Sequence, residues 1–69
     1  MIWFLYKNNN NNIVSCSACK ENNKWNSLYI NELFSFQKGF GAKLLLYLLN
    51  LNYNIIYLNS DWSQPESLN

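Results

Sequence analysis

The sequence predicts a small α+β fold, an antiparallel β-β-β meander followed by a β-α-β crossover. Three observations carry this prediction. Segments rich in aromatic and β-branched residues occupy residues 2–7, 13–20 and 28–36, with turn-forming residues between them. Leucines then recur with helical spacing, and a last β-branched segment follows. The chain has 69 residues, so we expect one domain.

The first two segments, IWFLYK at residues 2–7 and IVSCSACK at residues 13–20, predict a β-hairpin over residues 2–20. Five of the 14 asparagines lie between them, at Asn8–Asn12. Asparagine favours turns and tolerates positive φ, so the run is interpreted as the loop tip. It is also typical of a low-complexity insertion. Neither interpretation assigns it any chemistry.

A second turn, residues 21–27, leads into LYINELFSF, residues 28–36, which we interpret as the third strand. Leu28 and Ile30 share one face of this strand, but the apolar pattern slips at Asn31–Glu32 and resumes at Leu33. Since side chains alternate along a strand, a slip of one residue predicts a β-bulge.

Phe40–Leu51 predicts a helix, because Leu44, Leu48 and Leu51 follow the i, i+4, i+7 pattern without an intervening proline. NIIYLNS, residues 54–60, is the fourth strand. A strand-helix-strand unit is almost always a right-handed crossover, so the third and fourth strands should be parallel. In the tail, Pro65 suits the first turn of a further helix.

The charge pattern excludes several classes of protein. The net charge is +1, with five scattered lysines and no arginine, which argues against nucleic-acid binding. No histidine is present, so the usual general base and most zinc ligand sets are absent. Asparagines interrupt the apolar stretch 44–58, and MIWFLY is too short for a signal peptide, so we expect no membrane span and a cytoplasmic, intracellular protein.

The two cysteines, Cys16 and Cys19, have C-x-x-C spacing, which occurs in metal and redox sites. Here they fall within a predicted strand, where residues three apart point to opposite faces. We therefore expect two reduced structural thiols and no metal site.

The only two glycines, Gly39 and Gly41, lie in QKGFGAKLL at the predicted strand-to-helix junction. The first N–H groups of a helix have no partner within the helix, and glycines let the backbone approach an anion closely. The P-loop is excluded by its spacing and by the missing Ser or Thr after lysine. The dinucleotide fingerprint is excluded because Leu44 stands at its third glycine.

The element order and the loop together resemble the central part of the GNAT family of acyl-CoA-dependent N-acetyltransferases. Residues 28–36 match the family's fourth strand, 37–45 its pyrophosphate loop and helix, and 54–60 its fifth strand. The loop signature Q/R-x-x-G-x-G/A ends on Gly39 and Gly41, with Phe36 at the Gln/Arg position and Gln37 one place later. Gln64 and Ser67 stand in the places of the family's N-x-x-A segment. The hairpin would match the second and third family strands.

This resemblance implies a GNAT-like core truncated at both ends, with the cofactor-binding unit at residues 28–59 and a tail at 60–69. The expected function is an N-acetyltransferase, or a fragment of one, that binds acetyl-CoA and acetylates a small-molecule or protein amine. Glu32 would be the catalytic carboxylate. The residues expected to bind the cofactor are Leu33, Phe34, Ser35, Gln37, Lys38, Gly39, Phe40, Gly41 and Ala42.

Two alternatives remain open on the sequence. One is a catalytically inactive GNAT remnant. The other is a small α+β interaction protein without a cofactor, in which the glycines only start the helix. In each case open strand edges predict self-association.

Overall fold

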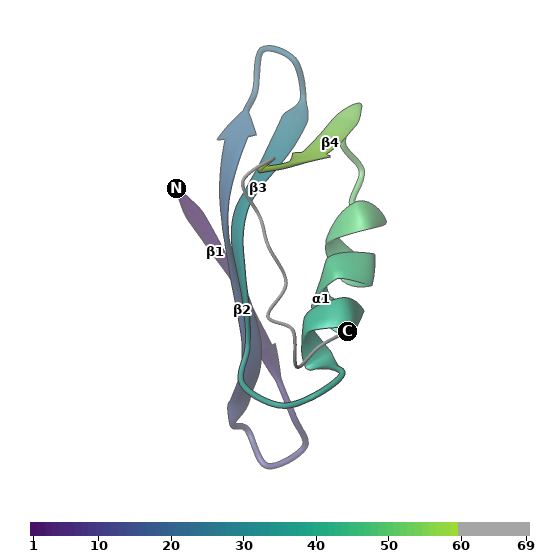
Figure 1. Cartoon of the computed structure of the whole chain (residues 1–69). Coiled ribbons are helices and arrows are strands. Elements are labelled where there is room, and N and C mark those ends of the chain that lie inside the picture. Colours follow the sequence, from purple (N-terminus) through teal and green to yellow (C-terminus); the bar gives the residue numbers. More distant parts are fainter. Residues whose placement is uncertain (60–69) are drawn as a thin grey trace.

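The computed structural model describes residues 1–59 and contains one sheet and one helix (Figure 1). The predicted α+β class is confirmed, and the helix lies over one face of the sheet. The Gln64, Ser67 and Pro65 predictions lie outside the described residues. The elements in chain order are β1 (Ile2–Lys7), β2 (Ile13–Asn22), β3 (Ser27–Ser35), α1 (Phe40–Leu49) and β4 (Ile55–Leu58).

The four strands are arranged in the order β1-β2-β3-β4. The β1/β2 and β2/β3 pairs are antiparallel, as the meander prediction requires. The β3/β4 pair is parallel, in a register from Ser27 opposite Ile55 to Ile30 opposite Leu58, which confirms the parallel strands expected of a crossover.

Several predicted boundaries are wrong by one or two residues. β2 continues to Asn22 and β3 begins at Ser27, because the turn between them closes tightly, with Asn26 at positive φ. α1 ends at Leu49 instead of Leu51, since the Asn50 side chain donates a hydrogen bond of 2.7 Å to the carbonyl of Leu46. β4 is limited to residues 55–58.

The asparagine run forms the predicted loop between β1 and β2. Asn8 Oδ1 accepts hydrogen bonds from the backbone N–H groups of Asn10 and Asn12, at 2.9 and 3.1 Å. Asn11 has φ 66°, a conformation that asparagine tolerates better than most residues. The run therefore closes its own turn through local side-chain-to-backbone bonds.

The bulge predicted in the third strand is confirmed. Ala18 pairs with Glu32 and the next β2 residue, Cys19, pairs with Ile30, so Asn31 is the extra residue on β3. Because of this extra residue, Leu28 and Ile30 before it and Leu33 after it lie on the same side of the sheet, against the core.

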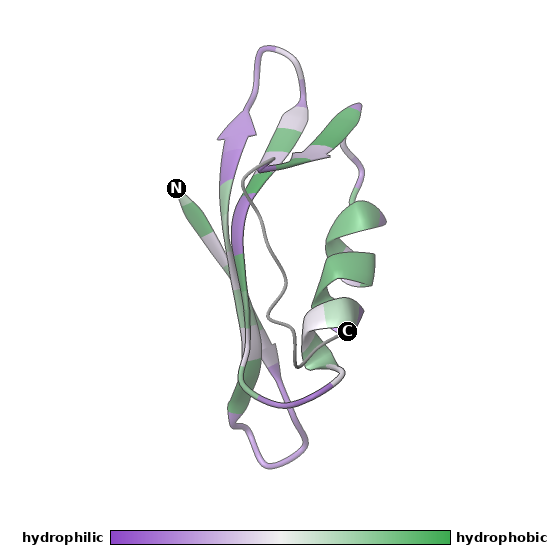
Figure 2. Cartoon of the chain, in the orientation of Figure 1, coloured by the Kyte–Doolittle hydropathy of each residue, from purple (hydrophilic) through white to green (hydrophobic). Residues whose placement is uncertain are grey.

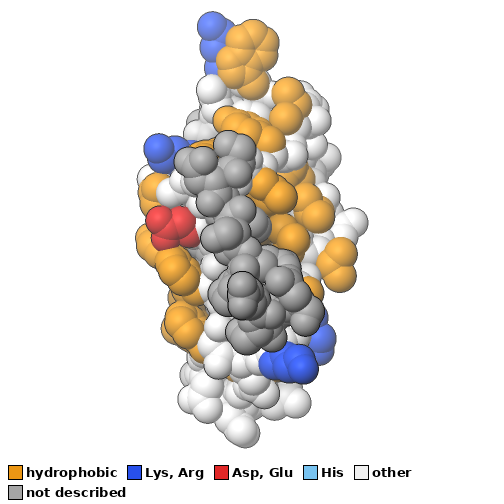
Figure 3. Space-filling model, in the orientation of Figure 1, with side chains coloured by type: hydrophobic (Ala, Val, Ile, Leu, Met, Phe, Trp, Pro, Cys, Tyr) orange, Lys and Arg blue, Asp and Glu red, His pale blue; other side chains and the backbone are white. Residues whose placement is uncertain are grey.

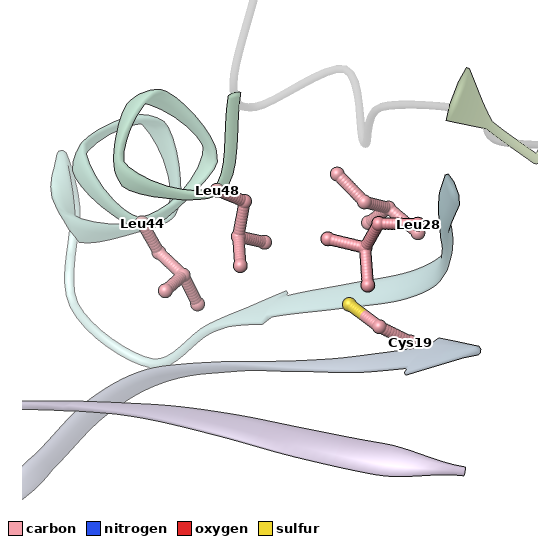
Figure 4. Close-up of a cluster of buried hydrophobic side chains, with 5 residues drawn as sticks. Cys19, Leu28, Leu44 and Leu48 are labelled. Carbon is pink, nitrogen blue, oxygen red and sulfur yellow. The ribbon is translucent and has the colours of Figure 1, made fainter. Parts of the chain in front are cut away.

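The core lies between the sheet and α1 (Figure 4). Leu44 and Leu48 extend from α1 towards Leu28 on β3 and Cys19 on β2, and with Ile30 these side chains are at most 2% exposed. Cys16 is buried as well, but parity along β2 places it on the opposite face. Both cysteines are free, as expected for structural thiols on opposite faces.

Hydrophobic residues occupy most of α1 (Figure 2). Lys43 is the one charged residue of the helix, and Leu46, Tyr47 and Leu49 are exposed. A helix that is hydrophobic on all sides is usually covered on all sides. Within the described part of the chain, no helix combines the length and the apolar character that a membrane crossing requires.

Candidate functional site at the junction of β3 and α1

The two glycines of the junction have different conformational roles. Gly39 is the residue before the first helical residue and has φ 91°, a left-handed conformation that L-residues rarely adopt. Gly41 lies in the first turn of α1, buried against β3. A Cβ at Gly41 would lie 3.0 Å from the Cβ of Ser35, which is tighter than most Cβ contacts, so glycine favours this close approach of helix and strand.

Two serines from the sheet fix the start of the helix. Ser35 Oγ accepts a hydrogen bond of 3.2 Å from the Gly41 amide and donates one of 2.8 Å to the carbonyl of Gln37. Ser15 Oγ on β2 donates a 2.9 Å bond to the carbonyl of Phe40. Ser35 thus supplies the acceptor that an N-cap side chain would otherwise supply, since Gly39 has no side chain.

The loop itself is attached to β2. The amides of Phe36 and Gln37 both donate to the carbonyl of Val14, at 2.9 and 3.3 Å, and the amide of Phe40 donates to the carbonyl of Gln37 at 3.2 Å. The resemblance implies phosphate binding by the amides of residues 38–42, and among these the amides of Phe40 and Gly41 already have acceptors. The amides of Lys38, Gly39 and Ala42 form no hydrogen bond within residues 1–59.

The strand before the loop has an open edge. β4 pairs with β3 only as far as Ile30, whose carbonyl accepts a 3.1 Å bond from the amide of Asn59. Beyond the bulge, the amide of Phe36 points towards β2, where it bonds the carbonyl of Val14. Backbone groups alternate in direction along an antiparallel strand. The backbone groups of Leu33 and Ser35 therefore point away from β2, to the side of β3 on which β4 pairs earlier in the strand. In the described part of the chain, no strand pairs with that edge after Ile30.

Two of the predicted site residues point away from this junction. Glu32 pairs with Ala18 and Phe34 pairs with Cys16, which places both side chains on the sheet face opposite α1. The ring of Phe34 stacks on Trp3 of β1, with the centroids 6.4 Å apart. The structure therefore brings Leu33, Ser35 and residues 37–42 together and leaves Glu32 and Phe34 on the other side.

Lysines supply positive charge near the loop. Lys38 is exposed beside Gly39, and Lys43 Nζ lies 4.8 Å from the centroid of the Phe40 ring, a cation–π arrangement. Together with the positive end of the helix dipole, these cations favour an anion over a neutral ligand at this position.

Two hollows on the described surface lie away from this junction. One, of about 320 Å³, lies between β1 and α1 and is lined by Phe4, Leu5, Tyr6, Lys7, Leu44 and Tyr47. The other, of about 370 Å³, lies near the far end of β2 and is lined by Lys20, Glu21, Asn22, Asn23, Tyr29 and Tyr57. Neither hollow is lined by the glycines or by the edge of β3 beyond Ile30.

Ser15 is the junction residue that the sequence analysis missed. It lies 25 positions before its partner, Phe40, and no local motif marks it. The serines at alternate positions of IVSCSACK were the available signal, because small polar residues on the core-facing side of a central strand need hydrogen-bond partners.

Comparison with protein-family models, with curated proteins and with solved structures found no match to this chain.

Proposed function

We propose that this chain is a GNAT-like N-acetyltransferase, or the core fragment of one, that binds acetyl-CoA at the junction of β3 and α1. The observation that carries the proposal is the edge of β3 at Leu33 and Ser35, with which no described strand pairs, beside a glycine loop in which three amides form no hydrogen bond within residues 1–59. The amides of Lys38, Gly39 and Ala42 would bind the pyrophosphate, with Lys38 adding charge. The loop thus has the pyrophosphate-binding role that the resemblance to the GNAT family implies.

The edge of β3 would hold the pantetheine arm. That arm is extended and contains amide groups, so it can pair with the backbone groups of Leu33 and Ser35 as an added strand does. The thioester would then lie near the bulge at Asn31. Transfer would proceed by attack of the amine nitrogen on the thioester carbonyl, with strand amides stabilising the oxyanion. The C–S bond then breaks, and the leaving CoA thiolate takes up the proton that the amine loses.

The proposed machinery consists of the β3 edge and the loop, without Glu32. The Glu32 side chain lies on the face opposite α1, so it could accept a proton only from an amine that approached from that face. The acceptor, a small-molecule or protein amine, is part of the proposal. So is a cytoplasmic location, which the two free thiols support.

Calorimetric titration with acetyl-CoA, and separately with CoA, tests the proposal through a matched pair of variants. Ala42 is exposed and its amide is unused, so Ala42→Glu places a carboxylate at the anion site without disturbing the packing. A carboxylate in the first turn also favours the helix. We expect Ala42→Glu to weaken binding at least about tenfold, since like charges at a binding surface cost several kcal/mol, and Ala42→Gln to retain it.

The same titration separates the alternatives. Absence of binding to the unsubstituted chain would remove the cofactor and leave an interaction protein. That candidate is favoured by one observation, the internal structural roles of both glycines. Binding without acetyl transfer to a panel of amines would identify an inactive remnant.

A further inference from the structure

The sheet face opposite α1 carries a group of exposed apolar side chains, which we call the outer sheet face. Its members come from β1, β3 and β4, and each has about half of its surface exposed. They are Trp3 (54%), Leu5 (53%), Phe34 (41%), Ile55 (53%) and Tyr57 (49%). The left margin of Figure 3, away from the helix, shows hydrophobic side chains with basic and acidic groups among them.

Small side chains of β2 lie beneath the centre of the outer sheet face. Ala18 and Cys16 of β2 are the residues there, and the rings of Trp3 and Phe34 lean over them and stack, with an interplanar angle of 17°. As a result Ala18 is only 2% exposed although no described element covers this face. The rows of larger side chains on either side of β2 give the face the relief that a second sheet could pack against.

Charge on the outer sheet face is self-complementary. Lys20 on β2 pairs across the ladder with Tyr29, and Glu32 on β3 pairs with Ala18, so the two charges lie two positions apart along neighbouring strands. Consider two copies stacked face to face, related by a twofold axis that lies between the sheets and runs across the strands at the level of residue 19. This axis places Lys20 of one copy opposite Ala18 of the other copy. Glu32 of that other copy is the neighbour of Ala18 across the ladder. The same operation forms the second, equivalent pair.

The area matches what a dimer of this size requires. With aromatic side chains at roughly 150–250 Å² each, the five half-exposed side chains present on the order of 500 Å² per copy. Two copies would then bury on the order of 1,000 Å², the lower limit for a specific interface. The net charge of +1 per chain adds little repulsion between copies.

From these observations we propose that the outer sheet face binds a second copy of this chain, forming a symmetric face-to-face sandwich of two sheets with α1 of each copy on the outside. The proposal does not rest on acetyl-CoA binding, because the junction of β3 and α1 lies on the other side of the sheet. It also differs from association through strand edges, since Lys20 lies on the central strand β2.

Charge reversal tests the proposal by sedimentation equilibrium of the full chain over about 1–100 µM. Lys20→Glu places like charges opposite each other twice per dimer, and like-charge contacts at an interface cost several kcal/mol. We expect the dissociation constant to rise more than about tenfold. The double variant Lys20→Glu/Glu32→Lys restores opposite charges and should return the constant to within about threefold of the original.

A second pair of variants tests the apolar contact. Leu5→Lys adds a charge to the outer sheet face, whereas Leu46→Lys adds the same charge to the exposed outer side of α1. We expect Leu5→Lys to yield a monomer with an unchanged far-ultraviolet spectrum, and Leu46→Lys to leave the dimer intact.

Three results would overturn the proposal. A chain that is monomeric at every concentration would mean that no second copy covers the face. A dimer indifferent to Lys20→Glu and Leu5→Lys would indicate edge pairing, and one dispersed by Leu46→Lys alone would indicate association through α1.

Discussion

Gly39 and Gly41 are two positions apart but are required for different physical reasons. At Gly39 the constraint is the backbone, since φ 91° is costly for any residue with a Cβ and the space around it is empty within 4 Å. At Gly41 the backbone is helical and the constraint is the neighbouring strand, because Ser35 occupies the space that a side chain would need. Substitutions at the two positions should therefore respond differently to changes at Ser35.

Gly41→Ala is expected to destabilise the fold by about 1 kcal/mol. Overpacking against Ser35 costs roughly 1–3 kcal/mol, and the higher helix propensity of alanine returns up to about 1 kcal/mol. Urea unfolding followed by circular dichroism measures the difference. In a Ser35→Gly background the loss should shrink, because the clashing Cβ is gone.

Gly39→Ala provides the matched control for this cycle. Its loss, about 1 kcal/mol from left-handed strain, should be the same in the unsubstituted chain and in the Ser35→Gly background, because no atom lies near the new Cβ. If Ser35→Gly changed the stability loss of Gly39→Ala as much as that of Gly41→Ala, the two glycines would not have separate roles.

Alkaline pH is expected to destabilise the protein through Cys19. Burial raises the pKa of the Cys19 thiol, an effect that its 3.4 Å contact with Ser17 Oγ only partly offsets. Above the unfolded-state thiol pKa of about 8.5, the unfolded chain loses a proton that the folded chain keeps, so the free energy of unfolding falls as pH rises. Below that pH the contribution is fully present.

Denaturant titrations between about pH 7 and pH 10 measure this slope, which cannot exceed about 1.4 kcal/mol per pH unit for one proton. Cys19→Ala should lower the stability at pH 7 but flatten the slope above pH 8.5. The pKa of Tyr53 is also raised, mainly by its hydrogen bond to Glu21, so the free energy of unfolding falls further at higher pH. Tyr53→Phe should remove this additional fall. A slope that both variants leave unchanged would contradict this origin.

At the scale of elements, α1 and β3 each supply two of the five side chains of the buried cluster, although α1 has only ten residues. Leu44 and Leu48 are the leucines of α1 whose side chains are fully buried, and they contact the apolar side chains of β2 and β3. An isolated helix of this length is unstable in water, so packing on the sheet holds α1 in place.

Leu48→Ala is expected to cost about 2–5 kcal/mol, which is comparable with the whole stability of a chain of this size. Leu46→Ala, a chemically identical change two residues away at a side chain that is 61% exposed, should stay within about 0.5 kcal/mol. Thermal unfolding of the two variants measures the contrast. Leu48→Met keeps the volume and should lose less than about 1.5 kcal/mol, and similar losses at Leu46 and Leu48 would contradict the packing.

The elements that the sequence predicted well are those whose pattern is local. The slip in the apolar pattern at Asn31–Glu32 predicted the bulge, and the spacing of the leucines predicted α1. Both patterns record which face of a strand or helix each side chain occupies. The predicted ends of the elements were less accurate. At the end of α1, the Asn50 side chain bonds the carbonyl of Leu46, and the helix stops two residues before the predicted Leu51. At the site, the side of the sheet to which Glu32 points depends on the bulge and on its pairing with Ala18. The hydrogen bond from Ser15 to the carbonyl of Phe40 comes from a strand far away in the sequence.

At the scale of the whole molecule, residues 1–59 form two layers whose outer surfaces are both rich in apolar side chains. The outer side of α1 exposes Leu46, Tyr47 and Leu49, and the outer sheet face exposes the side chains of β1, β3 and β4 already named. Small domains bury a low fraction of their surface, so covering either layer would add substantially to the stability. The outer sheet face has the paired charges for a symmetric contact, whereas α1 offers only Lys43.

Stability should therefore depend on the concentration of the chain. If folding is coupled to the proposed dimer, raising the concentration from the dissociation constant to a hundred times that value adds about 2 kcal/mol. For a domain of this size that corresponds to an increase in Tm of about 10 °C. Calorimetric scans of the unsubstituted chain at the two concentrations measure the shift, and Leu5→Lys should abolish it while Leu46→Lys retains it. A Tm independent of concentration would mean that the outer sheet face adds nothing to folding through a second copy.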